Sequence, residues 1–229
     1  MKTSKNDFTN MKTSNKLLSA TVVITLIVQA LLVFGYKSAY LEQLTAKKEK
    51  AHTVFRTFDK EQASAKVLRA KGIRFVLHLG GEKEGFRHDY RRVGLGFAKR
   101  GDTLEISAVT ERDDNVDFCE LYFSEMPAIE LYNSNVTIVT TKPMDASLLI
   151  KKNSVCALEK GMWGNVNAQV EDISKLRLVE GSEINQLMVS LADKAGLEDV
   201  GTAVKKIRLT TQSDSSEVKL SGKSLKNLY

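Results

Sequence analysis

The stretch Ile129-Glu-Leu-Tyr-Asn-Ser-Asn-Val136 decides the fold. A short apolar-x-apolar strand comes first, a polar turn follows, and a second strand begins at Val136. The same pattern returns from Leu148, Leu176 and Ile207, at intervals of roughly 20 to 30 residues. Because Asn, Ser and Gly tolerate tight or left-handed backbone, they suit the corners between such strands. The recurrence predicts a β-solenoid, in which each coil lies on the one below it.

Apolar residues also alternate with polar ones on both sides of this repeat. The alternation predicts strands over residues 73–79, 103–109, 116–123, 128–131, 136–140, 147–150, 155–158, 175–179, 184–191, 206–210 and 217–220. No convincing helix interrupts these strands, so residues 72–229 are expected to form one all-β soluble domain. A β-sandwich is the structural alternative, since short strands at this spacing also suit it.

A run of twenty uncharged residues, Leu17 to Tyr36, lies between Lys16 and Lys37. At about 1.5 Å per residue, a helix of this length spans roughly 30 Å, the thickness of the bilayer's hydrocarbon core. A cleaved signal peptide is the alternative, but it predicts a shorter apolar core and a small-x-small cleavage site. The run is therefore expected to be an uncleaved signal anchor after a cytoplasmic tail at residues 1–16.

Residues 37–71 show apolar spacings near three and four, which predict a short helical stalk. The segment carries nine Lys or Arg residues against four Asp or Glu residues, which suits a position beside lipid head groups. A coiled coil or an amphipathic membrane helix is the alternative, but fewer than three clean heptads favour a simple spacer.

The composition argues against several partners and cofactors. The net charge of +6 is not gathered into one patch with interleaved aromatic residues, so nucleic acid is not an expected partner. The two cysteines, Cys119 and Cys156, form no CxxC motif, which excludes a cysteine zinc site. They could form one disulfide, but their apolar, alternating surroundings favour two buried side chains. No metal or other cofactor is expected.

Two features could bind a ligand at the surface. Arg87, Tyr90, Arg91 and Arg92 belong to a basic, aromatic segment that could hold an acidic polysaccharide or a lipid head group. The same segment could instead be the solvated face of a β-hairpin. Trp163, the only tryptophan, lies between two glycines in an apparent turn, where it could be an exposed binding aromatic or a cap over the interior.

Catalytic chemistry finds little support in the sequence. The three histidines, His52, His78 and His88, have no Ser or Cys nucleophile motif beside them. The acidic cluster over residues 111–117 begins like a calcium loop, but Phe118 replaces the glycine that such a loop needs. An enzyme is therefore not expected.

Three stretches of the sequence together resemble one known family. They are the strand before a glycine turn at Ile73 to Gly81, Arg100-Gly-Asp-Thr-Leu-Glu-Ile106, and the strand, Met-Pro and Asn-Ser sequence from Leu121 to Ile138. The family is the head GIN domain family of auto-transporter adhesins among Bacteroidota envelope proteins, and the resemblance covers Gly72 to Leu228. It implies a β-solenoid-like, extracytoplasmic domain without assigned activity. The uncleaved anchor and the stalk depart from many relatives, which argues against release from the cell.

The sequence therefore predicts a single-pass protein of the inner (cytoplasmic) membrane with its carboxy-terminal domain outside the cytoplasm. Charge alone does not orient the anchor, because lysines flank it on both sides. The expected function is a non-catalytic binding or scaffold module of the cell envelope, with an envelope polysaccharide or protein as partner. The alternatives are a structural subunit of a secretion or conjugation assembly and a β-helix enzyme acting on polysaccharide.

Overall fold

The computed structural model describes residues 29, 53–89, 94–108 and 119–228. The chain divides into two compact units, residues 1–51 and residues 52–229. The predicted tail and, apart from Gln29, the predicted membrane span lie outside the described residues. Within the described part of the chain, no helix is both long enough and apolar enough to cross a membrane.

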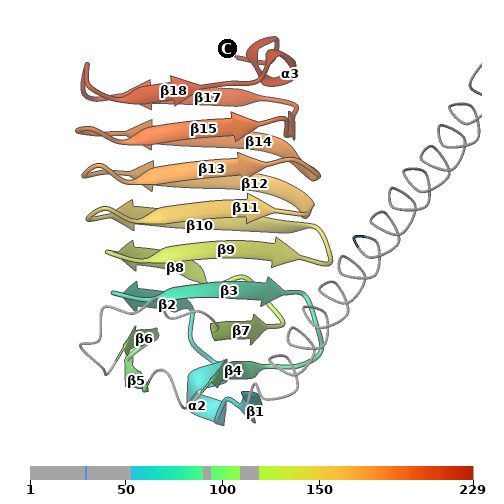
Figure 1. The fold of residues 1–229 in the computed structure, drawn as a ribbon, viewed down its shortest axis with the longest axis vertical. Coiled ribbons are helices and arrows are strands. Elements are labelled where there is room, and N and C mark those ends of the chain that lie inside the picture. Colours follow the sequence, from blue (N-terminus) through green and yellow to red (C-terminus); the bar gives the residue numbers. More distant parts are fainter. Residues whose placement is uncertain (1–28, 30–52, 90–93, 109–118, 229) are drawn as a thin grey trace, which may run out of the picture. The chain divides into compact units, whose positions relative to one another are not determined.

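The described part of the second unit is nearly all β-structure (Figure 1). Its elements, in chain order, are β1 (Thr53–Thr57), α2 (Lys60–Ala63), β2 (Val67–Lys71), β3 (Arg74–Leu79), β4 (Gly85–Asp89), β5 (Leu95–Arg100), β6 (Thr103–Ala108), β7 (Cys119–Phe123), β8 (Ala128–Tyr132), β9 (Asn135–Thr140), β10 (Met144–Lys151), β11 (Val155–Glu159), β12 (Gly161–Val170), β13 (Lys175–Val179), β14 (Ser182–Leu191), β15 (Gly196–Val200), β16 (Ala203–Val204), β17 (Ile207–Thr211), β18 (Glu217–Lys219) and α3 (Gly222–Leu225).

The strands form two sheets that face each other across one apolar interior. Sheet A has the order β1-β4-β7-β3-β9-β11-β13-β15-β18, and sheet B has the order β16-β14-β12-β10-β8-β2-β6-β5, with β17 also paired to β14. From β8 to β15 the chain alternates between the sheets, and each strand pairs in parallel with the next strand of its own sheet; β16 and β17 then both pair with β14 of sheet B. The strands are therefore stacked along one direction (Figure 1).

The pairing of residues between neighbouring strands shows the period of the repeat. In sheet B, Ile129 pairs with Leu148 and Leu148 with Ala168. In sheet A, Val136 pairs with Cys156 and Cys156 with Leu176. Each pairing therefore advances the chain by about twenty residues. The longer predicted intervals on either side of Leu176 are wrong as steps of the repeat, because Leu176 belongs to sheet A whereas Leu148 and Ile207 belong to sheet B.

The chain does not follow the stack in order at its amino-terminal end. Strand β2 pairs in parallel with both β6 and β8, and β3 pairs in parallel with both β7 and β9. Strands β6 and β7, from the segment between β3 and β8, therefore lie on the side of β2 and β3 that faces away from β8 and β9. Strands β4 and β5 of the same segment pair antiparallel there with β7 and β6, which closes the parallel stacking at this end.

Alternate side chains of both sheets fill the interior, and most are fully buried. The largest fully buried side chains are Trp163, Leu68, Leu77, Leu79, Leu104, Ile106, Leu121, Ile129, Leu131, Ile138, Ile150 and Leu158. At the amino-terminal end, the ring of Phe58 lies 5.0 Å from that of Phe123 and 5.8 Å from that of Phe86, measured between centroids. This aromatic cluster covers the apolar interior at its amino-terminal end.

A ladder of buried serines lines one corner of the stack. The hydroxyl of Ser134 accepts from the Ile73 backbone N–H at 3.2 Å. The Ser154 hydroxyl accepts from Ser134 N–H at 3.0 Å, and the Ser174 hydroxyl from Ser154 N–H at 3.1 Å. All three serines are buried. Each serine therefore satisfies a backbone donor of the neighbouring corner that no strand partner reaches.

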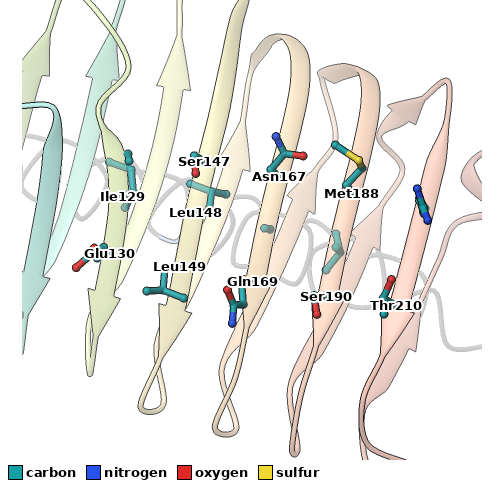
Figure 2. Close-up of a pocket in the computed structure, with 14 residues that line it drawn as sticks. Ile129, Glu130, Ser147, Leu148, Leu149, Asn167, Gln169, Met188, Ser190 and Thr210 are labelled. Carbon is teal, nitrogen blue, oxygen red and sulfur yellow. The ribbon is translucent and has the colours of Figure 1, made fainter.

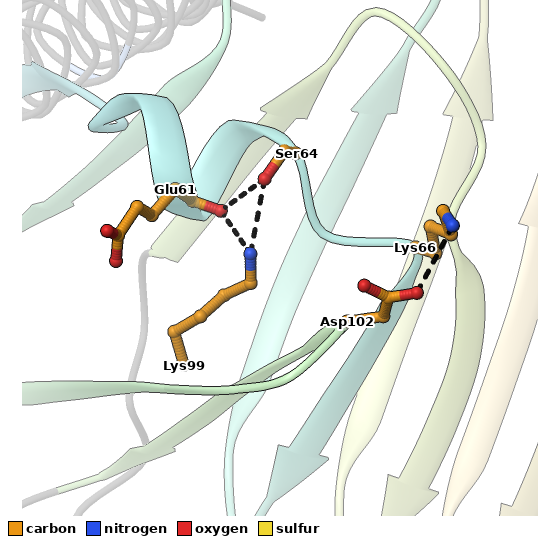
Figure 3. Close-up of polar contacts among 5 residues, drawn as sticks. All are labelled: Glu61, Ser64, Lys66, Lys99 and Asp102. Carbon is orange, nitrogen blue, oxygen red and sulfur yellow. Dashed lines mark hydrogen bonds and ion pairs between the residues drawn. The ribbon is translucent and has the colours of Figure 1, made fainter.

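The short helix α2 fastens the amino-terminal end (Figure 3). The Asp59 side chain and the Gln62 side chain form a capping box at its start. Figure 3 shows Lys99 of β5 reaching its end, where the ammonium donates to the Glu61 carbonyl at 2.5 Å and to the Ser64 hydroxyl at 3.2 Å. A cation at a helix carboxy terminus meets the negative end of the helix dipole. These contacts tie β5 to the segment before β2.

Two sequence predictions need correction here. The helix expected over residues 37–71 does not occur in its described part, residues 53–71, which forms β1, the four-residue α2 and β2. Pairing explains the difference, since β2 lies between two strands far along the chain and tertiary contacts override the local spacing. Trp163 does not lie in a turn, because it belongs to β12, and only 1% of it is exposed.

Candidate functional site

The outer face of sheet B carries a shallow groove of about 440 Å³ across β8, β10, β12, β14 and β17 (Figure 2). We call it the sheet B groove. The side chains that line it include Glu130, Ser147, Leu149, Asn167, Gln169, Met188, Ser190, Arg208 and Thr210. They come from five strands that are well separated along the chain, so only the stacking brings them together.

The strand register arranges these residues in two rows that run along the stack. One row contains Ser147, Asn167, Met188 and Arg208, which pair in that order. The other row contains Glu130, Leu149, Gln169, Ser190 and Thr210. Neighbouring strands lie about 4.7–4.9 Å apart, so each row repeats a side chain at that interval.

Most polar groups of the groove are available to a ligand. Within the described residues, the side chains of Ser147, Asn167 and Ser190 make no hydrogen bond to another protein group, and neither do those of Thr210 and Arg208. The Gln169 amide does have a partner, since it donates to the Glu171 carboxylate. Hydroxyl and amide groups both donate and accept, so the groove can bond a ligand rich in hydroxyls.

The two charged residues stand toward opposite ends of the groove. Glu130 on β8 is bound by Arg69, whose Nε lies 2.6 Å from its carboxylate. Arg208 on β17 has no ion-pair partner among the described residues. Between them Leu149 and Met188 add apolar surface (Figure 2). The centre of the groove is therefore uncharged and amphipathic.

Of the predicted basic segment, only Arg87 belongs to the described residues. Tyr90, Arg91 and Arg92 lie outside them. The Arg87 guanidinium is 3.6 Å from the carboxylate of Glu120, and 43% of its side chain is exposed. Much of its charge is therefore balanced by a neighbour, which weakens the case for Arg87 as an anion-binding residue.

Glu120 also connects Arg87 to a small polar cluster on sheet A. The Tyr122 hydroxyl donates to the Glu120 carboxylate. Burial and this hydrogen bond raise the pKa of Tyr122 to about 12, so the phenol stays protonated. The His78 ring stacks on Tyr122 at 4.8 Å, and its Nε2 lies 3.6 Å from Glu120. The interactions join strands β3, β4 and β7, and they are typical of a cross-strand network.

The remaining candidates from the sequence do not form a site. Trp163 is buried, so it cannot be an exposed binding aromatic, and the surface role is wrong. Cys119 and Cys156 are free and buried, which confirms the prediction of two apolar-type side chains. Burial raises the pKa of Cys119 to about 12. No group of metal-ligating side chains occurs among the described residues, while the acidic cluster at residues 111–117 lies outside them.

Comparison with known proteins does not identify the chain. No family profile matches its sequence. No curated protein matches it. A structure from Clostridium sporogenes, provisionally described as a cell adhesion protein, is 11% identical, covers 75% of this chain and 100% of its own, and has a TM-score of 0.27. One from Bacteroides fragilis, provisionally described as an adhesin, is 12% identical, covers 73% and 96%, and has a TM-score of 0.29. At these scores the likeness carries no conclusion about fold or function.

Proposed function

We propose that the chain is a non-catalytic binding module of the cell envelope, built as a β-solenoid and tethered to the inner membrane by residues 17–36. The parallel stacking at regular steps along the chain supports the solenoid. The uncharged run of the sequence supports the tether. The proposal includes an extracytoplasmic domain and membership of the head GIN family. The sheet B groove is the observation that carries the binding role.

The ligand class that we propose is a linear glycan lying along the stack. Five strands at about 4.8 Å spacing present side chains over roughly 19 Å, so an extended polymer would meet a polar group at every strand. The hydroxyl and amide groups of Ser147, Asn167 and Ser190 suit sugar hydroxyls. The apolar surfaces of Leu149 and Met188 suit the C–H faces of sugar rings.

A bulky side chain in the groove tests this role. Asn167 is exposed at the middle of β12, so Asn167→Trp fills the groove without entering the interior. Met162→Trp is the matched control, because Met162 is 51% exposed on the same strand but does not line the groove. Retention of the full chain on envelope glycan should fall at least tenfold for Asn167→Trp and stay unchanged for Met162→Trp. Equal retention of both variants would refute the groove as the binding site.

The location is tested separately. A tag after Tyr229 should be digested when protease is added to intact spheroplasts, since the proposal places the domain outside the cytoplasm. Protection of the tag until lysis would place the domain inside and overturn the envelope role.

A further inference from the structure

A second hollow opens at the corner of sheet B, where the chain leaves β2, β8 and β10. It has a volume of about 500 Å³ and is lined by Arg69, Lys71, Gly72, Tyr132, Asn133 and Lys152. We call it the corner pocket. All of its charged lining residues are cations, which distinguishes it from the sheet B groove.

Two of the three cations are held in place by carboxylates outside the pocket lining. The Nε of Arg69 donates to Glu130 at 2.6 Å, and Lys71 lies 2.8 Å from Glu105. The hydrogen bond that Arg69 donates to Glu130 raises the pKa of Arg69, and the one that Lys71 donates to Glu105 lowers the pKa of Glu105. Arg69 and Glu105 therefore stay charged, and the ion pairs restrict the side chains of Arg69 and Lys71.

Lys152 is the cation whose ammonium makes no ion pair within the described residues, although the Asp172 carboxylate accepts a hydrogen bond from its backbone N–H at 3.3 Å. Its ammonium lies over the Tyr132 ring, 5.8 Å from the centroid, and has no ion-pair partner among the described residues. The pocket lining itself holds three cations and no carboxylate, and of these only Lys152 has an ammonium or guanidinium group without an ion pair. A cation held over a ring and left without a counter-ion is suited to binding an anion.

The corner pocket adjoins the sheet B groove. Glu130 lines the groove, Arg69 lines the pocket, and their ion pair connects the two. Tyr132 follows Glu130 by two residues on the same strand, which places it about 7 Å further along β8. A polymer in the groove can therefore reach the pocket without leaving the surface of sheet B.

We propose that the corner pocket binds an anionic group, a carboxylate or a phosphate, carried by the glycan in the groove. This inference rests on the proposed function, because it names the chemical class of the same ligand. Lys152 provides the charge without an ion pair, while Arg69 and Lys71 line the pocket as N–H donors whose charges Glu130 and Glu105 balance. The preferred ligand is thus an acidic glycan.

The backbone of the corner suggests suitable variants. Lys152 has a φ of 54°, a left-handed conformation that asparagine tolerates well, so Lys152→Asn removes the charge without straining the turn. Lys160 is the matched control, because it is exposed, has a φ of 38° and does not line the pocket. Gly72→Asn tests the corner pocket in a second way, because the added side chain takes up space in the pocket and leaves its charges unchanged. Gly72 has a φ of 64° and faces open space, and the neighbouring corner has Asn133 in the corresponding turn.

The experiment measures binding of the full chain, in detergent, to three probes: oligogalacturonate, its neutral methyl ester and poly(glycerol phosphate). At low salt, at least one anionic probe should bind about tenfold more tightly than the ester, as expected for one charge-assisted contact. Lys152→Asn and Gly72→Asn should each remove that preference and leave ester binding unchanged, whereas Lys160→Asn should keep it. The two anionic probes distinguish a carboxylate from a phosphate as the recognised group.

Other outcomes overturn the inference. Equal affinity for the anionic probes and the ester, or a preference that survives Lys152→Asn, would refute the corner pocket while leaving the groove in place. Failure of all three probes to bind would refute both. If Asn167→Trp alone loses binding of the ester, the groove binds the neutral sugar chain without help from the corner pocket.

Discussion

Replacing Ser154 by alanine should destabilise the stack more than its small size suggests. The Ser154 hydroxyl accepts from the buried Ser134 N–H at 3.0 Å and donates to the Lys151 carbonyl at 2.5 Å. Leaving a buried donor without a partner costs about 1–3 kcal/mol, and a lost intramolecular hydrogen bond about 0.5–1.5 kcal/mol. Both hydrogen bonds involve the Ser154 hydroxyl oxygen, so one substitution removes them together and their costs do not simply add. We expect the free energy of unfolding to fall by about 2–3 kcal/mol.

Urea unfolding of residues 52–229, the compact unit, measures this effect. For a slope of about 2 kcal/mol per molar urea, the midpoint should fall by roughly 1–1.5 M at unchanged slope. Ser147→Ala is the matched control, because Ser147 is exposed and makes no hydrogen bond to a described residue. Its effect should stay within about 0.5 kcal/mol. Similar midpoints for the two variants would refute the idea that the serine ladder satisfies the corner donors.

Three further predictions concern buried groups. Iodoacetamide at pH 8 should not label Cys119 or Cys156 until the chain unfolds, because burial raises the pKa of both thiols. Mass spectrometry of the native chain after treatment measures the labelling, and a labelled cysteine would contradict the burial of that thiol. Trp163 fluorescence should be blue-shifted and shielded from iodide until urea unfolds the interior, whereas quenching of native chain would argue against its burial. Burial opposes ionisation of Asp199, but hydrogen bonds from residues that include Ser221 outweigh it and lower its pKa. The stabilisation is therefore present above about pH 4 and is lost as the pH falls through the lowered value. Unfolding measured from pH 6 to pH 3 should show a smaller loss in Asp199→Asn, and an equal loss would contradict the assignment.

Strands with strict alternation could be predicted from the sequence because one of their faces is buried. Residues 175–179, for example, form β13 over the predicted range. Strand β12 escapes prediction because Gly161 and Gly164 indicate a turn around Trp163. The structure gives these glycines another role. A Cβ on Gly161 would lie 2.3 Å from the Thr140 side chain, and one on Gly164 would lie 2.2 Å from the Asp145 side chain, so the glycines allow these side chains to approach the β12 backbone closely.

The stalk and the groove show what local pattern cannot reveal. Val67 of β2 pairs with Thr103 and Ala128, both far beyond residues 37–71, and spacing within that segment contains no trace of these partners. The groove likewise needs the register, since Asn167 becomes a neighbour of Ser147 and Met188 only when the strands stack. Strand β12 supplies its centre. Without that strand, the regular period of the stack and the groove could not be derived.

A crystal structure of the chain with a bound acidic tetrasaccharide would test the central claim most directly, because it locates the ligand on one face. We expect a sugar chain along the outer face of sheet B, over Asn167, with an anionic group beside Lys152. A ligand bound to sheet A, or to the end of the stack at β18, would contradict it.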